Sequence, residues 1–451
     1  MNSMKKFFVC AVAFMFAACL FYGCGNDISI DAQSHEDIIK EMTPIKEHEP
    51  LSQNSIMYVD PSTVWTRAKD SSSIYKDMMK QVEYFETLVF IKEDEFEKYS
   101  DRENFENRLN EYKQKNYTNI RNAIDSISRG NQQAMIITDF EDIKQGKRAS
   151  QNSYLTEGFK TWLSRGYQID ILTEPYYEEK NWLKKRFYVF FTDPENKESK
   201  NNTMKEQVKK YIVEEGVSEV GKCSWFTLVC NDVCVNRETD KNSCSNDIEV
   251  KTIKYPQNHC ELNIINNSWD EIKEYVMKLD SHNQVEGETP LPIVDGLKLS
   301  NGINYNVDKL KVQATNISKL YLSKQVKADS LKGEPSDISS DIFKGEPLDI
   351  SDAFDIEIDN ENKISIFVNK NIFSDKHLYS SNDKFDNNLI RLDLIVDGNS
   401  YNDFDKNIFN WEEKNGDVID AVSLSIENQL RDKELVPSGI LYTIYLQTES
   451  K

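Results

Sequence analysis

Four oxygen-bearing side chains stand where the sequence leaves an apolar run or enters a helix. Asp60 and Ser62 follow the apolar run 55–59, Thr118 opens a helical stretch, and Asp139 follows a second apolar run. If both runs are strands of one parallel sheet, their carboxyl ends meet at the edge where open sheets bind ligands. Carboxylates and hydroxyls are hard oxygen ligands suited to Mg²⁺ or Ca²⁺. The spacing therefore predicts a divalent-cation site at this edge.

The order of these residues resembles the metal-ion-dependent adhesion site of the von Willebrand factor A domain, across residues 54–216. In that family a first strand ends in Asp-x-Ser-x-Ser, a later loop supplies a threonine, and a further strand ends in Thr-Asp. Asp60 and Ser62 match the first motif, Thr118 matches the second, and Asp139 matches the third. The resemblance extends to the position of each motif between a strand and a helix.

The resemblance implies a binding function of the adhesion type. A cation would be held directly by Asp60, Ser62 and Thr118, and through water by Asp139, and a carboxylate of the partner would complete its coordination. Val64 stands where the family has its second serine, so one direct ligand is missing from this chain.

Two other interpretations use the same residues. In the first, Asp60 and Asp139 cap turns or helices, and Thr118 is the N-cap of the helix that follows it. In the second, Asp60, Asp139, Glu141 and Asp142 hold a metal for hydrolysis, although no histidine or lysine base is evident beside them. The chain contains neither a Gly-x-Ser-x-Gly elbow nor a His-Glu-x-x-His pair.

Strands and helices that alternate along residues 54–216 must position this site. Hydrophobic spacing predicts strands at 55–59, 87–91, 134–138, 167–172 and 186–191, and helices at 67–85, 105–112, 119–127, 154–163 and 203–214. This alternation predicts an α/β fold, a doubly wound parallel sheet with helices on both faces. The basic run 184–186 precedes the last strand and is interpreted as a solvated edge.

The chain begins with an export signal that ends at a cysteine. Two lysines precede the apolar run 7–22, which is short for a bilayer span, and Gly23-Cys24 follows it. This arrangement resembles the lipobox of bacterial lipoproteins, in which a diacylglycerol is attached to the sulfur of the first mature residue. The family prefers leucine three residues before that cysteine, where this chain has Phe21.

Cys24 is the predicted lipidation site. Cys19 is a rival, but cleavage before it would leave large apolar residues on the tether. An uncleaved anchor helix and an ordinary secreted protein are the alternatives to a lipid anchor. With a lipid on Cys24, the protein would be held at the bacterial cell envelope, in the outer membrane or at the cell surface.

The charge of the chain excludes several classes of partner. The 451 residues carry a formal net charge of −21, which argues against nucleic acid or an anionic lipid surface because phosphate would be repelled. Such a charge suits an exported domain that must stay dispersed. The length allows two or three domains with substantial cores.

Five cysteines crowd into one part of the sequence, namely Cys223, Cys230, Cys234, Cys244 and Cys260. In an oxidising exported compartment this crowding predicts a local disulfide cluster with one thiol left over, and the pairing stays open. A zinc site is the competing interpretation, but the spacings do not supply paired CxxC-type knuckles.

The remaining segments complete a predicted organisation in five parts. The signal peptide (1–23) is followed by a polar tether (24–53), the A-like domain (54–216), a cysteine-containing connecting region with a helix at 268–279 (217–289), and a β-rich C-terminal domain (290–451). Alternating apolar residues predict strands of a β-sandwich at 309–314, 363–368, 389–396 and 439–446.

The sequence as a whole predicts a lipid-anchored, non-enzymatic binding protein of the bacterial envelope. It names neither a protein nor a glycan partner. The alternatives are the metal-dependent hydrolase described above and a protein whose β-rich domain binds the partner while the A-like domain serves as a scaffold.

Overall fold

The structure, a computed structural model of the whole chain, describes residues 50–237, 260–264 and 292–447 with gaps. The gaps lie at 65–73, 76–77, 79–84, 93–94, 112–117, 142, 145–146, 149–152, 180–181, 195, 197–198, 216, 219–220, 231, 320–346, 374–379, 382–383, 386–387 and 413–414. The predicted export signal, Cys24, the tether and the helix at 268–279 therefore lie outside the described residues. No helix within the described ranges is long and apolar enough to cross a membrane.

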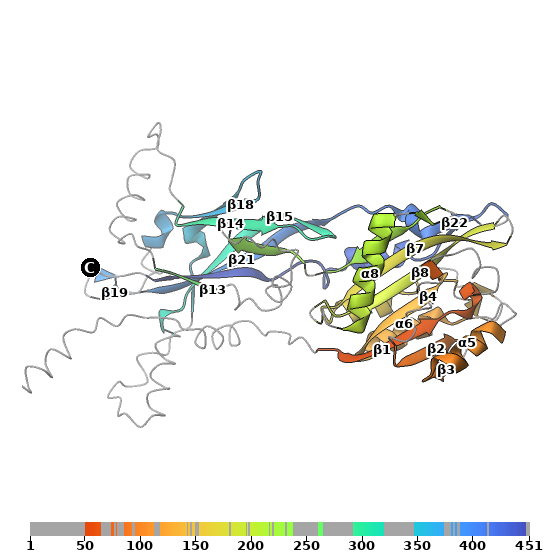
Figure 1. Cartoon of the computed structure of the whole chain (residues 1–451). Coiled ribbons are helices and arrows are strands. Elements are labelled where there is room, and N and C mark those ends of the chain that lie inside the picture. Colours follow the sequence, from red (N-terminus) through yellow and green to blue (C-terminus); the bar gives the residue numbers. More distant parts are fainter. Residues whose placement is uncertain are drawn as a thin grey trace, which may run out of the picture.

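A seven-stranded sheet forms the centre of the α/β body (Figure 1). In order across the sheet, its strands are β11 (Ser224–Leu228), β7 (Gln168–Glu179), β8 (Trp182–Thr192), β4 (Gln132–Thr138), β1 (Ser52–Val59), β2 (Thr87–Ile91) and β3 (Phe96–Tyr99). The five predicted strands fall on β1, β2, β4, β7 and β8, whereas β3 and β11 were not predicted. The fold is thus mixed α/β.

Parallel pairing is confined to the middle of this sheet. β1 pairs in parallel with β2 and β4, while β3, β8, β7 and β11 join by antiparallel pairing. The predicted all-parallel sheet is therefore wrong outside the central three strands. The physical reason is the short link at 180–181 between β7 and β8, because parallel neighbours need a crossover of about a dozen residues or more.

Helices cover both faces of the sheet, as predicted. They are α5 (Arg102–Glu111), α6 (Ile120–Arg129), α7 (Thr156–Leu163) and α8 (Lys200–Glu215). Alternate residues of β1 divide the core, because Tyr58 packs in the cluster with α6 and α7, whereas Met57 and Val59 pack in the cluster with α5 and α8. The period of two along a strand produces this division.

Helix α6 illustrates why these segments are helical. Its buried residues include Ile120, Ala123, Ile124 and Ile127, which recur every three or four positions and so form one apolar stripe. The helix begins after Asn119, whose side-chain oxygen accepts a hydrogen bond from the backbone N–H of residue 122 at 2.9 Å.

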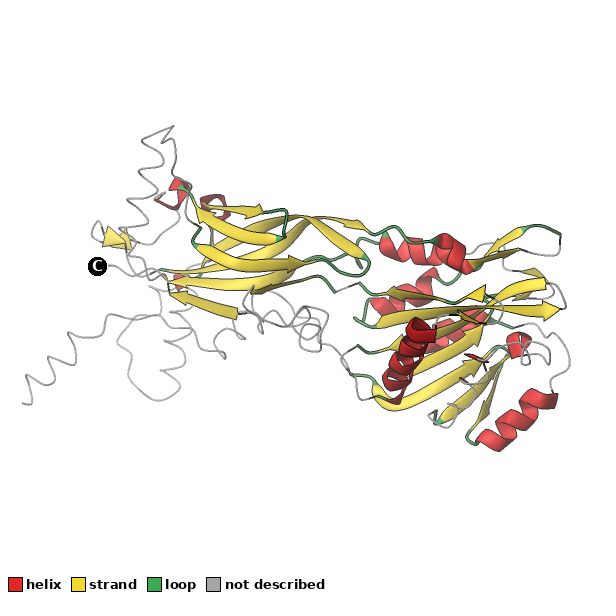
Figure 2. Ribbon diagram, turned by 45° about the horizontal axis from the view of Figure 1, so that its top comes forward, coloured by secondary structure: helices red, strands yellow, loops and turns green. Residues whose placement is uncertain are grey.

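Two further sheets form the β-rich body (Figure 2). One contains β12 (Cys234–Arg237), β14 (Val294–Ser300), β18 (Lys363–Val368) and β17 (Phe354–Ile358), and the other contains β13 (Cys260–Ile264), β24 (Ile440–Gln447), β21 (Leu389–Tyr401), β15 (Tyr305–Asn316) and β16 (Leu348–Asp349). Leu297 and Ile364 of the first sheet share a hydrophobic cluster with Leu310 and Leu392 of the second. The four strands predicted beyond residue 290 fall on β15, β18, β21 and β24.

Short elements complete the described chain. They are the 3-10 helices η1 (Pro61–Val64), η4 (Ser351–Ala353), η5 (Lys370–Phe373) and η6 (Lys406–Phe409), the hairpins β5 (Ile143–Lys144) with β6 (Lys147–Arg148), β9 (Val217–Ser218) with β10 (Gly221–Lys222), β19 (Ser380–Ser381) with β20 (Lys384–Phe385) and β22 (Asn410–Glu412) with β23 (Val418–Asp420), and helix α12 (Ser423–Leu430).

The segment between β21 and β24 packs on the α/β body. The Gln429 side chain of α12 donates to the backbone oxygen of Thr156 at 2.7 Å, at the start of α7. The rings of Phe409 and Trp411 lie 6.2 and 6.3 Å from the ring of Phe187 in β8. A single hydrophobic cluster consequently extends from the α/β body into the β-rich body.

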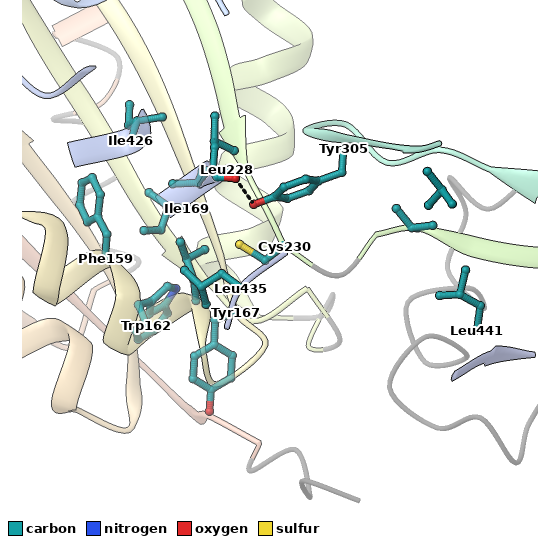
Figure 3. Packing of buried hydrophobic residues seen from close by; sticks show 14 of the residues in the cluster. Phe159, Trp162, Tyr167, Ile169, Leu228, Cys230, Tyr305, Ile426, Leu435 and Leu441 are labelled. Carbon is teal, nitrogen blue, oxygen red and sulfur yellow. Dashed lines mark hydrogen bonds between the residues drawn. The ribbon is translucent and has the colours of Figure 1, made fainter. Parts of the chain in front are cut away.

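Asparagine side chains strengthen the junction between the two bodies. Asn304 in the β14–β15 turn accepts from the backbone N–H of Val229 at 2.8 Å and donates to the backbone oxygen of Thr227 at 2.9 Å. Its own backbone oxygen accepts from Asn402, the residue that follows β21. Leu228, Cys230 and Tyr305 lie in the same region in Figure 3. The turn thus contacts two segments that connect the bodies.

Two of the five clustered cysteines form no disulfide. They are Cys223 and Cys230, which flank β11 and are both buried, while Cys234 is disulfide-bonded. The side chains of Cys244 and Cys260 lie outside the described residues. With Cys223 and Cys230 reduced, this group can hold at most one internal disulfide, so the expectation of one leftover thiol does not hold. Burial raises the pKa of the Cys230 thiol to about 12.

Candidate functional site

Asp60 and Asp139 lie beside each other at the carboxyl end of two parallel strands. β1 and β4 pair with Val59 opposite Ile137, and the backbone N–H of Asp60 donates to the Ile137 oxygen at 2.9 Å. Both carboxylates are almost fully buried, with 0% and 1% of each residue exposed. The two predicted acidic residues therefore meet as the sequence predicted, because the register of parallel strands brings their ends together.

Hydrogen bonds fix Asp60 and the turn that follows it. The Thr138 hydroxyl donates to Asp60 Oδ2 at 3.2 Å, which links the ends of β4 and β1. The Asp60 backbone oxygen accepts from the N–H of Thr63 at 3.1 Å and from its hydroxyl at 2.8 Å. The bonds to Thr63 close η1 directly after the strand. The Asp60 residue is therefore held by Thr138 at its carboxylate and by Thr63 at its backbone oxygen.

The remaining predicted ligands are placed less completely. Ser62 and Val64 belong to η1, but their side chains lie outside the described residues. Thr118 is buried, with 2% exposed, just before α6. The N-cap of α6 is Asn119, so the alternative in which Thr118 caps the helix is wrong.

A strained turn follows β4 and orients its acidic residues. Asp139 Oδ1 accepts from the backbone N–H of Glu141 at 3.0 Å, and the Thr138 hydroxyl accepts from the N–H of Phe140 at 2.9 Å. Phe140 has a positive φ of 59°, which is rare for a bulky residue. Its ring lies 4.9 Å from Phe187. Asp139 therefore caps its own turn, as one of the alternative interpretations expected.

Lys184 neutralises the acidic residues of this turn. Its Nζ lies 3.1 Å from Asp139 Oδ2 and 3.3 Å from Glu141 Oε1, and only 1% of the lysine side chain is exposed. The same ammonium lies 5.1 Å from the ring centroid of Trp182 and 5.9 Å from that of Trp411. A buried carboxylate requires a partner of this kind, since an unpaired buried charge is very costly. We call the carboxylates of Asp60, Asp139 and Glu141 the acid edge.

Arg186 supports the other side of the acid edge. Its guanidinium lies 3.3 Å from Glu174 Oε2 and donates to the backbone oxygen of Thr63 in η1 at 2.9 Å. The rings of Tyr176 and Tyr75 lie 4.4 and 4.7 Å from its central carbon. The arginine thus connects β8, β7 and the turn that carries Asp60.

The surroundings of Arg186 keep neighbouring groups in a single protonation state. The Tyr188 hydroxyl donates to Glu174 at 2.7 Å, and burial, followed by the charge of Glu174, holds the pKa of Tyr188 well above its usual range. Burial likewise raises the pKa of Tyr75. Both hydroxyls therefore stay protonated at neutral pH, and the Arg186 group is a structural support rather than a source of protons.

The interpretation of residues 184–186 as a solvated edge was wrong. These residues lie inside β8, and Lys184 and Arg186 are fully buried while Lys185 is only partly exposed. A signal was present in the sequence, because Lys184, Arg186 and Tyr188 alternate along a strand-like run and so occupy one face. Buried acidic turns are also stabilised by counter-charges, which nearby lysines or arginines can supply.

The described residues do not fit an open divalent-metal site of the kind that the resemblance implies. The carboxylates of Asp139 and Glu141 already share the Lys184 ammonium, and Val64 replaces one ligand. Within the described ranges, no group of three or more His, Cys, Asp or Glu side chains is arranged to hold a metal ion. The metal therefore stays a prediction, which titration tests.

No known relative extends this description. The chain matches no protein-family model, no curated protein and no solved structure.

Proposed function

We propose that this chain is a lipid-anchored binding protein of the bacterial envelope that presents the free end of its α/β body to a partner. The anchor would be a lipid on Cys24, as its resemblance to lipoprotein signals implies. Binding would take place on the exposed surface around the acid edge, because the Asp60 and Asp139 carboxylates themselves are buried. The partner would be a protein or glycan outside the membrane.

The observation that carries this proposal is the position of the acid edge at the far end of β1. This strand starts at Ser52, on the side of the α/β body that faces the β-rich body (Figure 1). β1 then runs away from this side for 8 residues, about 26 Å at 3.3 Å per residue. The acid edge consequently lies at the end of the α/β body opposite the start of β1.

Exposed apolar side chains lie near the same free end. Val418 in β23 is 67% exposed, and Tyr177 and Leu183, which are paired across β7 and β8, are 41% and 42% exposed. The Trp182 indole N–H donates to the backbone oxygen of Glu412 at 3.0 Å, which joins this hairpin to the β22–β23 hairpin. Apolar residues within a polar rim are common in protein interfaces.

The same geometry favours binding over hydrolysis. A hydrolase would need Asp139 and Glu141 as metal ligands or bases, but both carboxylates are held by the Lys184 ammonium. The function that these contacts support best is therefore recognition.

The proposal predicts that a partner is captured specifically at the free end. Photoreactive residues would be placed one at a time at Tyr177 and Val418 in the full-length protein, in the cells that make it. Irradiation of intact cells is expected to give one discrete adduct from both positions. Gel shift followed by mass spectrometry would measure the adduct.

The matched control is a photoreactive residue at Glu361, which is exposed in the β17–β18 turn of the β-rich body. This position should not give the same adduct. An adduct from Glu361 alone would assign binding to the β-rich body, and the absence of any adduct from the free end would contradict the proposal.

A further inference from the structure

We propose that the Lys184 ammonium is the resident cation of the acid edge, built into the chain in place of a divalent metal. The assignment concerns how charge is balanced at this edge, and it stands whether or not the edge binds a partner. The sequence motif consists of oxygen ligands alone, so it does not include Lys184 or predict its role as a counter-charge.

The ammonium lies against two carboxylates that a metal bound in this turn would need. Its Nζ lies between Asp139 Oδ2 at 3.1 Å and Glu141 Oε1 at 3.3 Å. A Mg²⁺ or Ca²⁺ ion would have to approach the same oxygens to about 2.0–2.6 Å. With a methylene chain and a charged nitrogen already there, a second cation would meet both steric overlap and repulsion.

Aromatic rings enclose the ammonium on its other sides. Trp182 and Trp411 present their rings at 5.1 and 5.9 Å from the nitrogen, within the range of cation–π attraction. Trp182 is itself fixed by its hydrogen bond to Glu412, and Trp411 is 95% buried. The lysine is therefore held by residues from β8, from β22 and from the turn after β4.

Burial makes this lysine difficult to displace. The Lys184 and Asp139 side chains are 1% and 2% exposed, so water cannot replace either partner when the pair separates. A surface ion pair would exchange freely with dissolved ions, whereas a buried pair that loses one partner leaves an uncompensated charge. The wild-type edge should consequently have little affinity for divalent metal.

Removal of the lysine charge should allow the carboxylates of Asp139 and Glu141 to bind an added cation. In Lys184→Met the side-chain volume is largely kept, but Asp139 and Glu141 lose their counter-charge. We expect this variant to be destabilised in the absence of metal and to be stabilised saturably by Mn²⁺. Linkage converts such binding into a rise of the melting temperature with metal concentration.

The test uses full-length protein purified in detergent and measures Mn²⁺ binding by electron paramagnetic resonance together with thermal unfolding. Lys184→Met is expected to bind Mn²⁺ at least about tenfold more tightly than wild type, equivalent to about 1.4 kcal/mol. The tighter binding should disappear in the double variant Lys184→Met with Asp139→Asn. Lys185→Met, which removes the same charge from the neighbouring position, should behave like wild type.

Two results would overturn the assignment. The first is saturable Mn²⁺ binding by wild type that is lost in Asp139→Asn, because the ammonium would then not occupy the site. The second is a folded Lys184→Met protein without any gain in Mn²⁺ binding. If Lys184→Met folds only when Mn²⁺ is present, that dependence supports the assignment. If Lys184→Met folds neither with nor without Mn²⁺, the assignment is tested by whether wild type binds Mn²⁺ in a manner that Asp139→Asn abolishes.

Discussion

Buried carboxylates in this protein are balanced in two different ways. Asp139 is paired with a lysine, whereas Asp232, which precedes β12 at the junction of the two bodies, has no cation against it among the described residues. Asp232 Oδ2 accepts from the backbone N–H of Ile303, and Oδ1 is buried without a hydrogen-bond partner. Burial raises the pKa of Asp232 from its ordinary 3.8 to about 6. The ionised form of Asp232, which prevails at neutral pH, therefore lowers the stability of the folded protein.

This penalty predicts a pH-dependent contribution to stability. Because the folded-state pKa is raised, the folded protein binds more protons than the unfolded chain between about pH 4 and 6. The contribution of Asp232 to the free energy of unfolding is fully present below pH 3.8 and is lost as the pH rises through 6. Asp232→Asn should therefore gain stability relative to wild type as the pH rises from 4.5 to 8, by about 2 kcal/mol. Denaturant unfolding at several pH values would measure the difference.

An exposed carboxylate in the same region provides the control. Asp403 follows β21 and is exposed, so the stability difference between Asp403→Asn and wild type should change little with pH. A stability difference for Asp232→Asn that is equally flat would contradict the account of Asp232 as a half-buried, unneutralised group with a buried Oδ1.

At the residue scale, the sequence allowed half of the candidate site to be predicted. Asp60 and Asp139 could be placed together because each directly follows an apolar run, and neighbouring parallel strands bring such positions into register. Lys184 could not be assigned to them. Its contact depends on the antiparallel pairing of β8 with β4, which no short motif around Asp139 encodes.

Connections between elements determine where the sequence prediction was right and where it was wrong. Long connections precede β2 and β4, so the parallel pairing of both with β1 follows the crossover rule. The link between β7 and β8 is too short for a helix, and the strands form a hairpin instead. The 13 residues between the apolar runs 167–172 and 186–191 would have allowed a crossover, so the sequence count alone could not have predicted the hairpin.

Close contact between α6 and α7 depends on a glycine. A Cβ atom at Gly158 would lie 2.6 Å from Ile124 Cγ2 and 3.2 Å from Asp125 Oδ1. Ile124 is fully buried and β-branched, so it cannot rotate away easily. Gly158→Ala should therefore lower the free energy of unfolding by about 1–3 kcal/mol, even though alanine favours helix formation. Denaturant unfolding measures this change.

Glu157, the exposed residue before Gly158, provides a control for alanine substitution in the same turn of α7 without a change in helix packing. Glu157→Ala changes the same turn of α7 on its solvent side, so its effect should stay within about 0.5 kcal/mol of wild type. If Gly158→Ala were as stable as Glu157→Ala, the two helices would not be in the close contact described here.

At the scale of the whole molecule, the two bodies share a core instead of being joined by one linker. β11 belongs to the α/β sheet, β12 and β13 belong to the β-rich body, and the segment that contains α12 returns to the α/β body before β24. Asn304 adds polar contacts across the junction. Such a chain path cannot be read from local patterns, because segments far apart in sequence pair only in the folded state.

The lipid on Cys24 is the claim that places this whole molecule at the envelope, and intact-mass measurement tests it most directly. Full-length protein would be expressed in a bacterium, extracted from its membranes and analysed by mass spectrometry. The account predicts a mature chain that begins at Cys24 and carries a diacylglycerol on its sulfur. Cys24→Ala should lose this lipid, whereas Cys19→Ala should keep it. A mature chain without lipid, or one that begins at another residue, would contradict the account.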